Sequence, residues 1–351
     1  MRYSELKMQG QTSYSELFEQ TQGFEMDNAM AGLTGSFQKQ ERQGKGFWYF
    51  GYRDVNRSTK MMYVGPDNAR TQDLIKKYSE TKKAGVQGPA ARVAIAAGCT
   101  PVAPKHFSII KRLSEYGFFR AGGILIGTHA FLALGNMLGV KWKDAQATLD
   151  VDFAHAGKNI SVALPANMTV DVHDALESLE LGLLPISLFN GRAGAQYRNP
   201  SDQELRVDFV TSMTRQGKPV VIPELNIALE PLKFMEFSLE QSTQGVIFSN
   251  RGACIVNLPA PSRFAVHKLI VYGERPERER VKSKKDLLQS ASLVEYFLKE
   301  GRADQFNEAW RDAVGRGPGW KRRAEQGRDA LFLLAPELAD NTLWTEATHS
   351  E

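Results

Sequence analysis

Hydrophobic and polar positions follow two different periods in the middle of the chain. A short apolar run over Gly123–Ile126 predicts a strand that ends at the step Gly127-Thr128. Apolar residues at helical spacing then predict a helix over Ala130–Leu138. Alternating apolar and acidic residues predict a second strand over Ala147–Phe153. This stretch is therefore expected to form a strand, a glycine turn, a helix and a second strand in succession.

The second of these strands carries two carboxylates on one face. Asp150 and Asp152 lie two residues apart, so their side chains project together, while Leu149, Val151 and Phe153 face the other way. Two carboxylates that lie close together repel each other unless a cation lies between them. The pair therefore indicates a Mg²⁺ site made of hard oxygen ligands.

A third acidic position occurs further along, in the stretch ELRVDFVTSM, where alternation predicts another strand. Asp208 lies between Val207 and Phe209 and shares its face with Arg206. The pattern therefore predicts three aspartates on the polar faces of buried strands.

The N-terminal third of the chain is more ambiguous. Residues 1–45 are polar, with a weak helical pattern around Tyr14–Phe24, which favours an arm on the body or on a partner subunit, or else a tail. Alternating aromatic residues over 46–66 predict a β-hairpin that turns at Asp54–Ser58.

The aromatic hairpin admits two interpretations. Trp48, Tyr49, Tyr52 and Arg53 are aromatic and basic, as in surfaces that stack on bases and contact phosphates. The favoured interpretation is that the aromatic residues cover the core of the next domain.

Further elements follow from periodicity and turn residues. A glycine-rich loop is expected over 189–201, and a hairpin over 245–259 that turns at Asn250-Arg251-Gly252. Helices are predicted over residues 69–92, 106–116, 172–181, 261–272 and 286–299. In the first of these, a Gly/Pro break should follow the Lys-rich part.

Composition narrows the class of protein. The 351 residues can hold a sizeable core and two or three structural units. A formal charge of +4 permits a nucleic-acid partner without requiring one. Cys99 and Cys254 are too few for a disulfide framework or a cysteine-based zinc site. No signal-peptide core and no membrane-spanning apolar run is visible, so we expect a cytoplasmic protein without a membrane partner.

The order of strand, Gly-Thr turn, helix and Asp-x-Asp strand resembles the core of the polymerase-β nucleotidyltransferase superfamily. The stretches GTHAFLALGNMLG, LDVDFAHAGKNISVALP and LRVDFVTSM look more specifically like a bacterial family of nucleotidyltransferase-fold proteins. That family is similar to the toxin nucleotidyltransferases of abortive-infection toxin–antitoxin systems. The resemblance runs from about Phe107 to Gly327.

The resemblance implies an α+β fold, in which a mixed sheet with flanking helices forms a nucleotidyltransferase core. We expect three domains along the chain. An N-terminal extension with the aromatic hairpin and a helix should cover residues 1–105, the core residues 106–240, and a mainly helical C-terminal domain residues 241–351.

The same resemblance implies roles for the three aspartates. Asp150 and Asp152 would hold two Mg²⁺ ions, and Asp208 would lie beside the ion nearer the attacking hydroxyl and assist its deprotonation. Asp150, Asp152 and Asp208 are therefore the expected catalytic and metal-binding residues.

Four residues are expected to bind the nucleotide. Gly127 would let the chain approach the phosphates without a Cβ clash, Thr128 would offer a hydroxyl, and the following helix would point its N-terminus at the anion. His129 would contact phosphate or be a packed polar residue. Lys268 resembles a lysine near the nucleotide in the related toxins.

Some neighbouring residues carry weaker expectations. Lys158 is a further candidate phosphate ligand, and the step Lys285-Asp286 resembles a Lys/Arg-Asp step of the related toxins. His155 would line the site or, as we favour, have a structural role.

The function implied is Mg²⁺-dependent transfer of NMP from an NTP such as ATP to a hydroxyl acceptor on RNA such as tRNA, on protein or on a small molecule. A toxin-like or defence role would use the same chemistry, with an antitoxin or a second copy as partner. The alternative is a nucleotide- or nucleic-acid-binding protein with little turnover.

Overall fold

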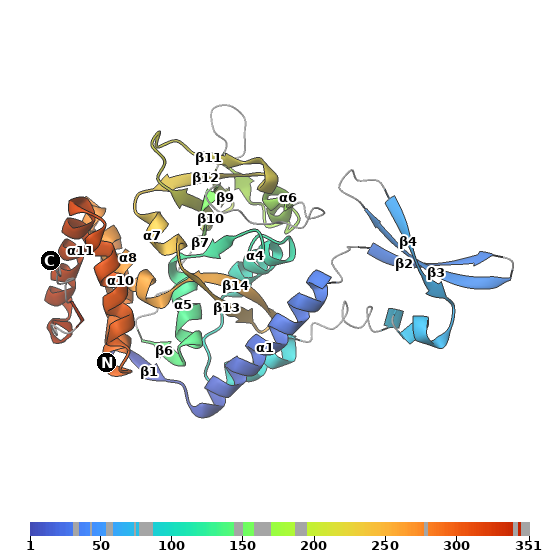
Figure 1. Ribbon diagram of the computed structural model, residues 1–351, viewed down its shortest axis with the longest axis horizontal. Coiled ribbons are helices and arrows are strands. Elements are labelled where there is room, and N and C mark those ends of the chain that lie inside the picture. The colour runs from blue at the N-terminus through green and yellow to red at the C-terminus, as the bar shows by residue number, and fades with distance from the viewer. Residues whose placement is uncertain are drawn as a thin grey trace, which may run out of the picture.

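A mixed β-sheet forms the centre of the computed structural model (Figure 1). The sheet runs in the order β11, β12, β10, β7, β5, and β9 joins β8 to β10. The strands are β5 (Gly123–Leu125), β7 (Asp150–His155), β8 (Leu184–Pro185), β9 (Gln196–Asn199), β10 (Asp202–Ser212), β11 (Val220–Ile222) and β12 (Ile227–Leu232). The structure describes residues 1–30, 35–42, 44–53, 59–73, 75–76, 87–143, 150–157, 170–186, 195–276, 280–339 and 343–344.

The central strands β7 and β10 run parallel and give the sheet one apolar and one polar face. Val151 pairs with Val207 and Phe153 with Phe209, and all four side chains are buried. The rings of Phe153 and Phe209 stack with their centroids 5.3 Å apart. Because side chains alternate along a strand, burial of these four residues leaves the acidic positions on the opposite face.

An antiparallel hairpin and four helices surround the sheet. The hairpin consists of β13 and β14 and turns where the sequence predicted. Tyr14 and Leu17 are buried with Val246 and Phe248, so the N-terminal arm packs on the body of the protein. These elements are α1 (Met8–Met30), α3 (Gln87–Ala96), α4 (Pro104–Glu115), α5 (Gly127–Met137), β13 (Ser242–Ser249) and β14 (Gly252–Pro259).

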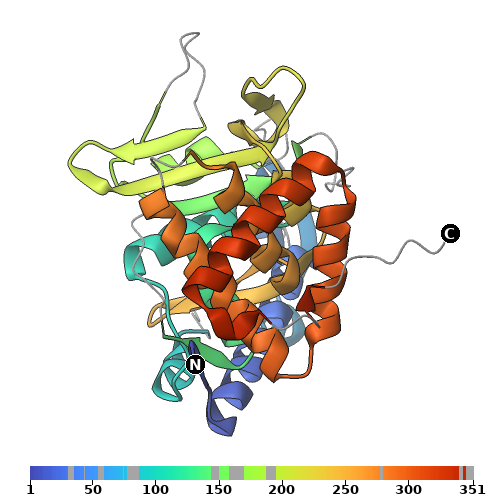
Figure 2. The same ribbon diagram turned by 90° about the vertical axis from the view of Figure 1, so that its left-hand side faces the viewer.

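Four further helices form the C-terminal part, and Figure 2 shows them in orange and red in front of the body. They are α8 (Pro261–Glu274), α9 (Arg280–Lys299), α10 (Ala303–Gly315) and α11 (Pro318–Leu334). Helices α8 and α11 lie so close that a Cβ on Gly273 would overlap the backbone of Arg323, and one on Gly327 that of Leu269. Glycine at both positions therefore allows this contact.

A separate three-stranded sheet lies at the opposite end from the C-terminal helices (Figure 1). It consists of β2 (Gly35–Arg42), β3 (Lys45–Arg53) and β4 (Thr59–Pro66), so the predicted aromatic hairpin is confirmed and a third strand was missed. Phe50 packs on Phe37 with ring centroids 5.0 Å apart, and the Trp48 Nε1–H donates to Asp67. The described aromatic residues thus pack within this sheet, and the prediction that they cover the next domain's core is wrong.

The remaining short elements complete the described chain. They are β1 (Tyr3–Glu5) paired with β6 (Val140–Trp142), α6 (Val172–Glu177), α7 (Met235–Leu239), and the 3₁₀ turns η2 (Pro223–Leu225) and η4 (Pro336–Leu338). Among the described helices, none combines the length and apolar character needed to cross a membrane.

The predicted α+β class is confirmed, with a mixed sheet, flanking helices, an N-terminal hairpin and C-terminal helices. The proposed limits of the three domains stay a prediction. The turn expected at residues 54–58 lies outside the described residues.

Three local predictions were wrong. The helix expected from Ala130 begins at Gly127, since the Ala130 N–H donates to the Ile126 carbonyl. The helix expected over 172–181 ends at Glu177, and Glu180 has a left-handed φ of 52°. Part of the loop expected over 189–201 is strand β9.

The predicted Gly/Pro break lies in the first turn of α3, which begins at Gln87, so a helix starts at this step and continues through the Ala-rich stretch that follows. Pro89 is tolerated there since a residue in the first turn has no intrahelical partner for its N–H.

The contact between α8 and α11 can be tested with two glycine substitutions. Gly327→Ala should lower the free energy of unfolding by about 1–3 kcal/mol, because the new methyl group overpacks the interface. Gly315→Ala is the control, since nothing lies within 4 Å of its Cβ position; it should be neutral or stabilising by about 0.5 kcal/mol. Urea unfolding measures both variants, and equal stability of the two would contradict the close contact.

Candidate active site

The register of β7 and β10 brings the three predicted aspartates together. Asp208 lies opposite Asp152, and Arg206 lies opposite Asp150. Since residues two apart in a strand share a face, all four side chains project from the polar face of the sheet. Local alternation thus produces a site made from two segments that are distant in the sequence.

Arg206 lies among the carboxylates. Its Nη2 is 2.7 Å from Oδ2 of Asp208 and 3.3 Å from Oδ2 of Asp150. Asp208 is 8% exposed, and its Oδ1 is buried without a hydrogen-bond partner among the described residues. The guanidinium therefore offsets part of the negative charge but leaves one carboxylate oxygen of Asp208 unpaired.

Asp152 lies directly against the glycine turn. A Cβ on Gly127 would overlap Oδ2 of Asp152, and Gly127 has a φ of +65°. The Ile126 N–H donates to the Asp152 carbonyl at 3.0 Å, which fixes the turn to the strand. Glycine at this position thus makes room for a carboxylate.

Burial and mutual repulsion change how these acids ionise. Burial, followed by the charges of Asp208 and Asp150, raises the pKa of Asp152 to about 6. Burial also raises the pKa of Asp208, although the Arg206 guanidinium acts in the opposite direction. Both carboxyls thus gain from a nearby cation, which would stabilise their charged forms.

Two cations, Lys268 on α8 and Arg275 just after this helix, line a cavity opposite this acidic surface, and Lys285 follows on α9. The Lys268 Nζ lies 2.6 Å from Oδ1 of Asp286, and Nη1 of Arg275 lies 2.7 Å from Oδ2 of the same residue. Burial, and then Lys268, lowers the pKa of Lys285, whose ammonium has no ion-pair partner among the described residues. Two cations therefore share one carboxylate on this side, and the third, Lys285, is paired with no described carboxylate.

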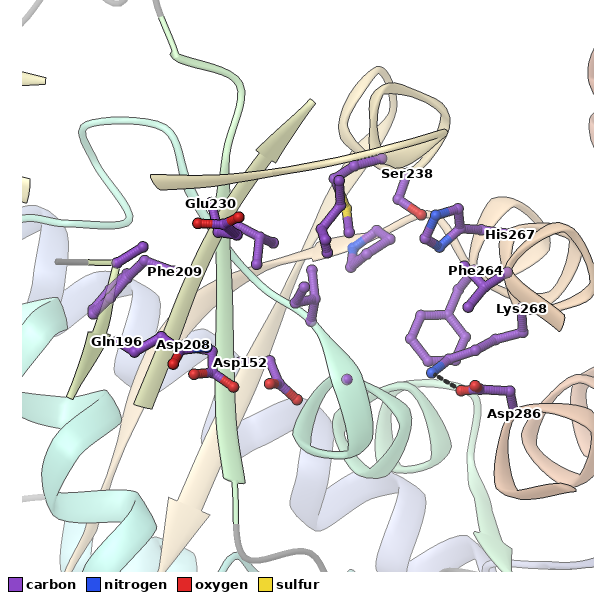
Figure 3. Close-up of a pocket in the computed structure, with 18 of the residues that line it drawn as sticks. Asp152, Gln196, Asp208, Phe209, Glu230, Ser238, Phe264, His267, Lys268 and Asp286 are labelled. Atoms are coloured by element: carbon purple, nitrogen blue, oxygen red, sulfur yellow. Dashed lines mark hydrogen bonds and ion pairs between the residues drawn. The ribbon is translucent and has the colours of Figure 1, made fainter. Parts of the chain in front are cut away.

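The cavity between the two sides has a volume of about 340 Å³. Figure 3 shows Asp152 and Asp208 at one end and Lys268 with Asp286 at another. Its lining residues are Ile126, Gly127, Asp152, Ala195, Gln196, Arg206, Asp208, Phe209, Val210, Glu230, Leu232, Met235, Ser238, Pro259, Phe264, His267, Lys268, Val271, Arg275 and Asp286.

The structure thus brings four residues of the predicted site together around one cavity: Gly127, Asp152, Asp208 and Lys268. The described residues that line this cavity do not include the other three, Asp150, Thr128 and His129. Thr128 is 6% exposed, and its hydroxyl accepts a hydrogen bond from Gln289 at 3.5 Å. The side chain of Thr128 therefore contacts α9.

His129 is packed beside another histidine. It is 2% exposed, and its Nε2 lies 3.0 Å from Nδ1 of His106 on α4. Burial, and then His106 and Lys285, lowers the pKa of His129 to about 3. The structure thus places His129 as a buried, neutral polar residue, the second of its two interpretations. Lys158 lies outside the described residues.

His155 is buried at the end of β7 with both ring nitrogens bonded. Its Nε2 lies 2.7 Å from the Ala121 carbonyl, and its Nδ1 accepts from the Gly157 N–H at 3.0 Å. Since an N–H faces Nδ1 and a carbonyl faces Nε2, the neutral tautomer with hydrogen on Nε2 satisfies both contacts. His155 is therefore structural, as favoured from the sequence.

The acidic face offers oxygen donors for a hard cation. Asp152 and Asp208 are opposite one another, and the unpaired Oδ1 of Asp208 is a free acceptor among the described residues. In the part of the chain that the structure describes, no group of three or more His, Cys, Asp or Glu side chains is arranged to hold a metal ion. The donors that fit Mg²⁺ are therefore this pair, with Asp150 held by Arg206.

Sequence reasoning missed several residues that line the cavity. Arg275, His267 and Ser238 were not candidates, and Asp286 was noted only as part of a Lys-Asp step. The spacing of Phe264, His267, Lys268, Val271 and Arg275 along α8 is the signal that could have found two of them, because residues three and four apart share a helix face.

Comparison with known proteins points to one family. A family model described as nucleotidyltransferase matches residues 105–315. A search of curated proteins gave no match. A crystal structure of an antigenic nucleotidyltransferase-like protein from Paracoccidioides brasiliensis matches with 14% identity, 70% of this chain, 96% of that chain and a TM-score of 0.35.

The contact between Gly127 and Asp152 can be isolated with a matched pair of substitutions. Gly127 and Gly301 both have a φ of +65°, but nothing lies within 4 Å of the Cβ position of Gly301. Gly301→Ala should therefore lower the free energy of unfolding by about 1–2 kcal/mol, the cost of a left-handed alanine.

Gly127→Ala should lower the free energy of unfolding further, by about 1–3 kcal/mol more than Gly301→Ala, because the methyl group displaces the Asp152 carboxylate. Adding Asp152→Ala to Gly127→Ala should remove this extra cost in a double-mutant cycle measured by urea unfolding. Equal losses in the two alanine variants would show that the carboxylate does not lie against the turn.

Buried histidines should make the fold sensitive to acid. Burial lowers the pKa of His155 below its ordinary value, so below about pH 6.5 the unfolded chain binds a proton that the folded chain does not. Stability should therefore fall as the pH drops. Between pH 7 and 5, His155→Gln should lose less stability than the wild type, by up to about 2 kcal/mol. Parallel pH profiles of the two proteins would contradict the neutral, buried ring.

Proposed function

The chain belongs to the nucleotidyltransferase family, and we propose that it transfers NMP from an NTP to a hydroxyl acceptor with Mg²⁺. The observation that carries this proposal is the register that sets Asp152 opposite Asp208 on one side of a cavity, with Lys268 on the other side. Nucleotidyl transfer needs carboxylates near the reacting phosphate and cations near the leaving pyrophosphate. Both sets line the same cavity.

The acidic side suits the reacting centre. Asp152 and Asp208 would hold Mg²⁺, and Asp150 would join them when Arg206 releases it. Bound Mg²⁺ supplies positive charge that offsets the charge on the phosphate oxygens. The Asp208 carboxylate would accept the proton of the attacking hydroxyl, and its raised pKa makes it a better base near neutral pH.

The basic side suits the phosphates that leave. Lys268 and Arg275 share Asp286, so each retains positive charge that is only partly offset. Lys285 has no ion-pair partner among the described residues, and the charge of Asp152 acts to raise its pKa, against the effect of burial. These cations would stabilise the pyrophosphate as the bond to the α-phosphorus breaks, while Gly127 leaves the acidic side open.

The finer parts of the proposal concern the acceptor and the biological role. RNA such as tRNA, protein or a small molecule would supply the hydroxyl, and ATP is among the candidate donors. A toxin-like or defence role in the cytoplasm, with an antitoxin or a second copy as partner, is proposed from the resemblance of the Gly-Thr and Asp-x-Asp stretches alone.

A second candidate function is nucleotide binding with little turnover. The ion pairs of Arg206 with Asp150 and Asp208 favour it, because they occupy two of the carboxylates needed for a metal. The two functions are separated by measuring transfer and binding on the same variants.

Asp208→Asn provides this separation. With labelled NTP, Mg²⁺ and total bacterial RNA or protein as acceptor, this variant should lose transfer by about 100-fold or more, since it removes a general base. Its affinity for Mg²⁺–NTP, measured by calorimetry, should fall much less than its transfer rate, because Arg206 already offsets part of the charge of Asp208. Asp152→Asn should lose both properties because it removes a metal ligand.

Glu224→Gln is the control, since this exposed acid lies outside the cavity and should transfer at the wild-type rate. Wild-type transfer by Asp208→Asn would remove this residue as the base. NTP binding without transfer in the wild-type protein, across all acceptors tested, would favour the second candidate function.

A further inference from the structure

The cavity has a third wall that differs from its acidic and basic sides. Helix α8 presents Phe264, His267 and Val271 there, three and four residues apart, and α7 presents Met235 and Ser238. Figure 3 shows Ser238 and His267 at the upper right of the cavity, away from Asp208. This recess has mainly apolar walls and two neutral polar groups.

His267 is buried in the recess, and one of its ring nitrogens is unsatisfied within the described chain. It is 7% exposed, and its Nε2 has no hydrogen-bond partner among the described residues. Burial, and then the charge of Lys268, lowers its pKa to about 3, so the ring is neutral at physiological pH. A neutral imidazole offers one N–H donor and one nitrogen acceptor.

Ser238 on α7 also carries a buried polar atom without a hydrogen-bond partner among the described residues. This atom is its Oγ, and the residue is 2% exposed. A hydroxyl can both donate and accept. A buried polar atom without a partner destabilises the free protein, so two of them on one cavity indicate groups that a ligand satisfies.

We propose that His267 and Ser238 form hydrogen bonds with the edge of the nucleotide base and so select which NTP is used. This inference rests on the proposed function, because it assumes that a nucleotide occupies the cavity. Apolar walls with Met235 and Val271 suit the faces of a heterocycle, and neutral donors and acceptors suit its edge.

The phosphates would not bind in this recess. An anion gains most from cations, and Lys268, Arg275 and Lys285 lie on the basic side of the site. The cavity volume of about 340 Å³ is also within the range of about 300–1,000 Å³ that is usual for small-molecule sites. The base and the phosphates thus have separate, chemically matched positions.

The test compares nucleotide binding with phosphate binding on the full chain. Calorimetry in Mg²⁺ measures the affinities for ATP, GTP, CTP and UTP, and for inorganic tripolyphosphate, which lacks a base. In Ser238→Ala, the ratio between the tightest and the weakest NTP should shrink by about tenfold, as expected for loss of one hydrogen bond to a buried group. Affinity for tripolyphosphate should remain within about twofold of the wild type, because no cation is changed.

A stability measurement separates a ligand-binding role from a structural one. Without nucleotide, Ser238→Ala should melt at or above the wild-type temperature, because it removes an unsatisfied hydroxyl. Ser290→Ala is the control, since this buried hydroxyl on α9 donates to the Ala265 carbonyl at 3.0 Å. It should melt at a lower temperature and retain the wild-type ratio of NTP affinities.

His267→Phe tests the second residue proposed to contact the base. It should also reduce the preference among the four NTPs, and His267→Gln, which keeps a donor and an acceptor, should restore part of it. An unchanged preference in Ser238→Ala and His267→Phe would overturn the inference, as would an equal loss of NTP and tripolyphosphate affinity.

The outcomes for the wild-type protein separate the two proposals. Binding of NTPs with a base preference that both variants reduce, but without transfer to any acceptor, would overturn the proposed enzyme and support the base-binding residues. Transfer with equal affinity for all four NTPs would do the reverse. Absence of NTP binding would overturn both.

Discussion

The parallel register between β7 and β10 is the constraint on which the site depends. Stacking of Phe153 on Phe209 and burial of Val151 and Val207 hold the two strands in this alignment. A slip of one residue would turn these side chains toward the polar face and the aspartates toward the core. The apolar core therefore sets which carboxylates meet, although it contributes no atom to the chemistry.

The same register explains why the carboxylates of the site repel each other. Asp152 and Asp208 lie side by side on neighbouring strands, and the pKa values of both are raised by burial and by the charges of neighbouring carboxylates. Arg206 relieves part of this repulsion through a position opposite Asp150. The site is thus organised by repulsion on one side of the cavity and by a surplus of positive charge on the other.

The acidic half of the site could be predicted from the sequence because alternation is local. A strand with Asp150 and Asp152 two residues apart defines a shared face, whatever the rest of the chain does. The basic half depends on helix packing: the spacing along α8 can place Lys268 and Arg275 on one face, but it does not say that this face lies opposite the aspartates. His129 illustrates the difference: its place in a helix was readable, but its burial depends on His106 of another helix. In the same way, a stretch that is polar in sequence contains strand β2, since its pairing with β3 decides its conformation.

The order of the chain has a consequence for its synthesis. The aspartates lie on β7 and β10, whereas the opposing cations lie on α8, at its C-terminal end and on α9, which the ribosome makes later, as it does the α8 wall of the recess. At about 5–20 residues per second, the growing chain carries an unopposed acidic sheet for several seconds before the basic helices emerge. Nascent chains of this protein would thus present a carboxylate surface without the basic helices that oppose it. The site would be complete only when the C-terminal helices have docked.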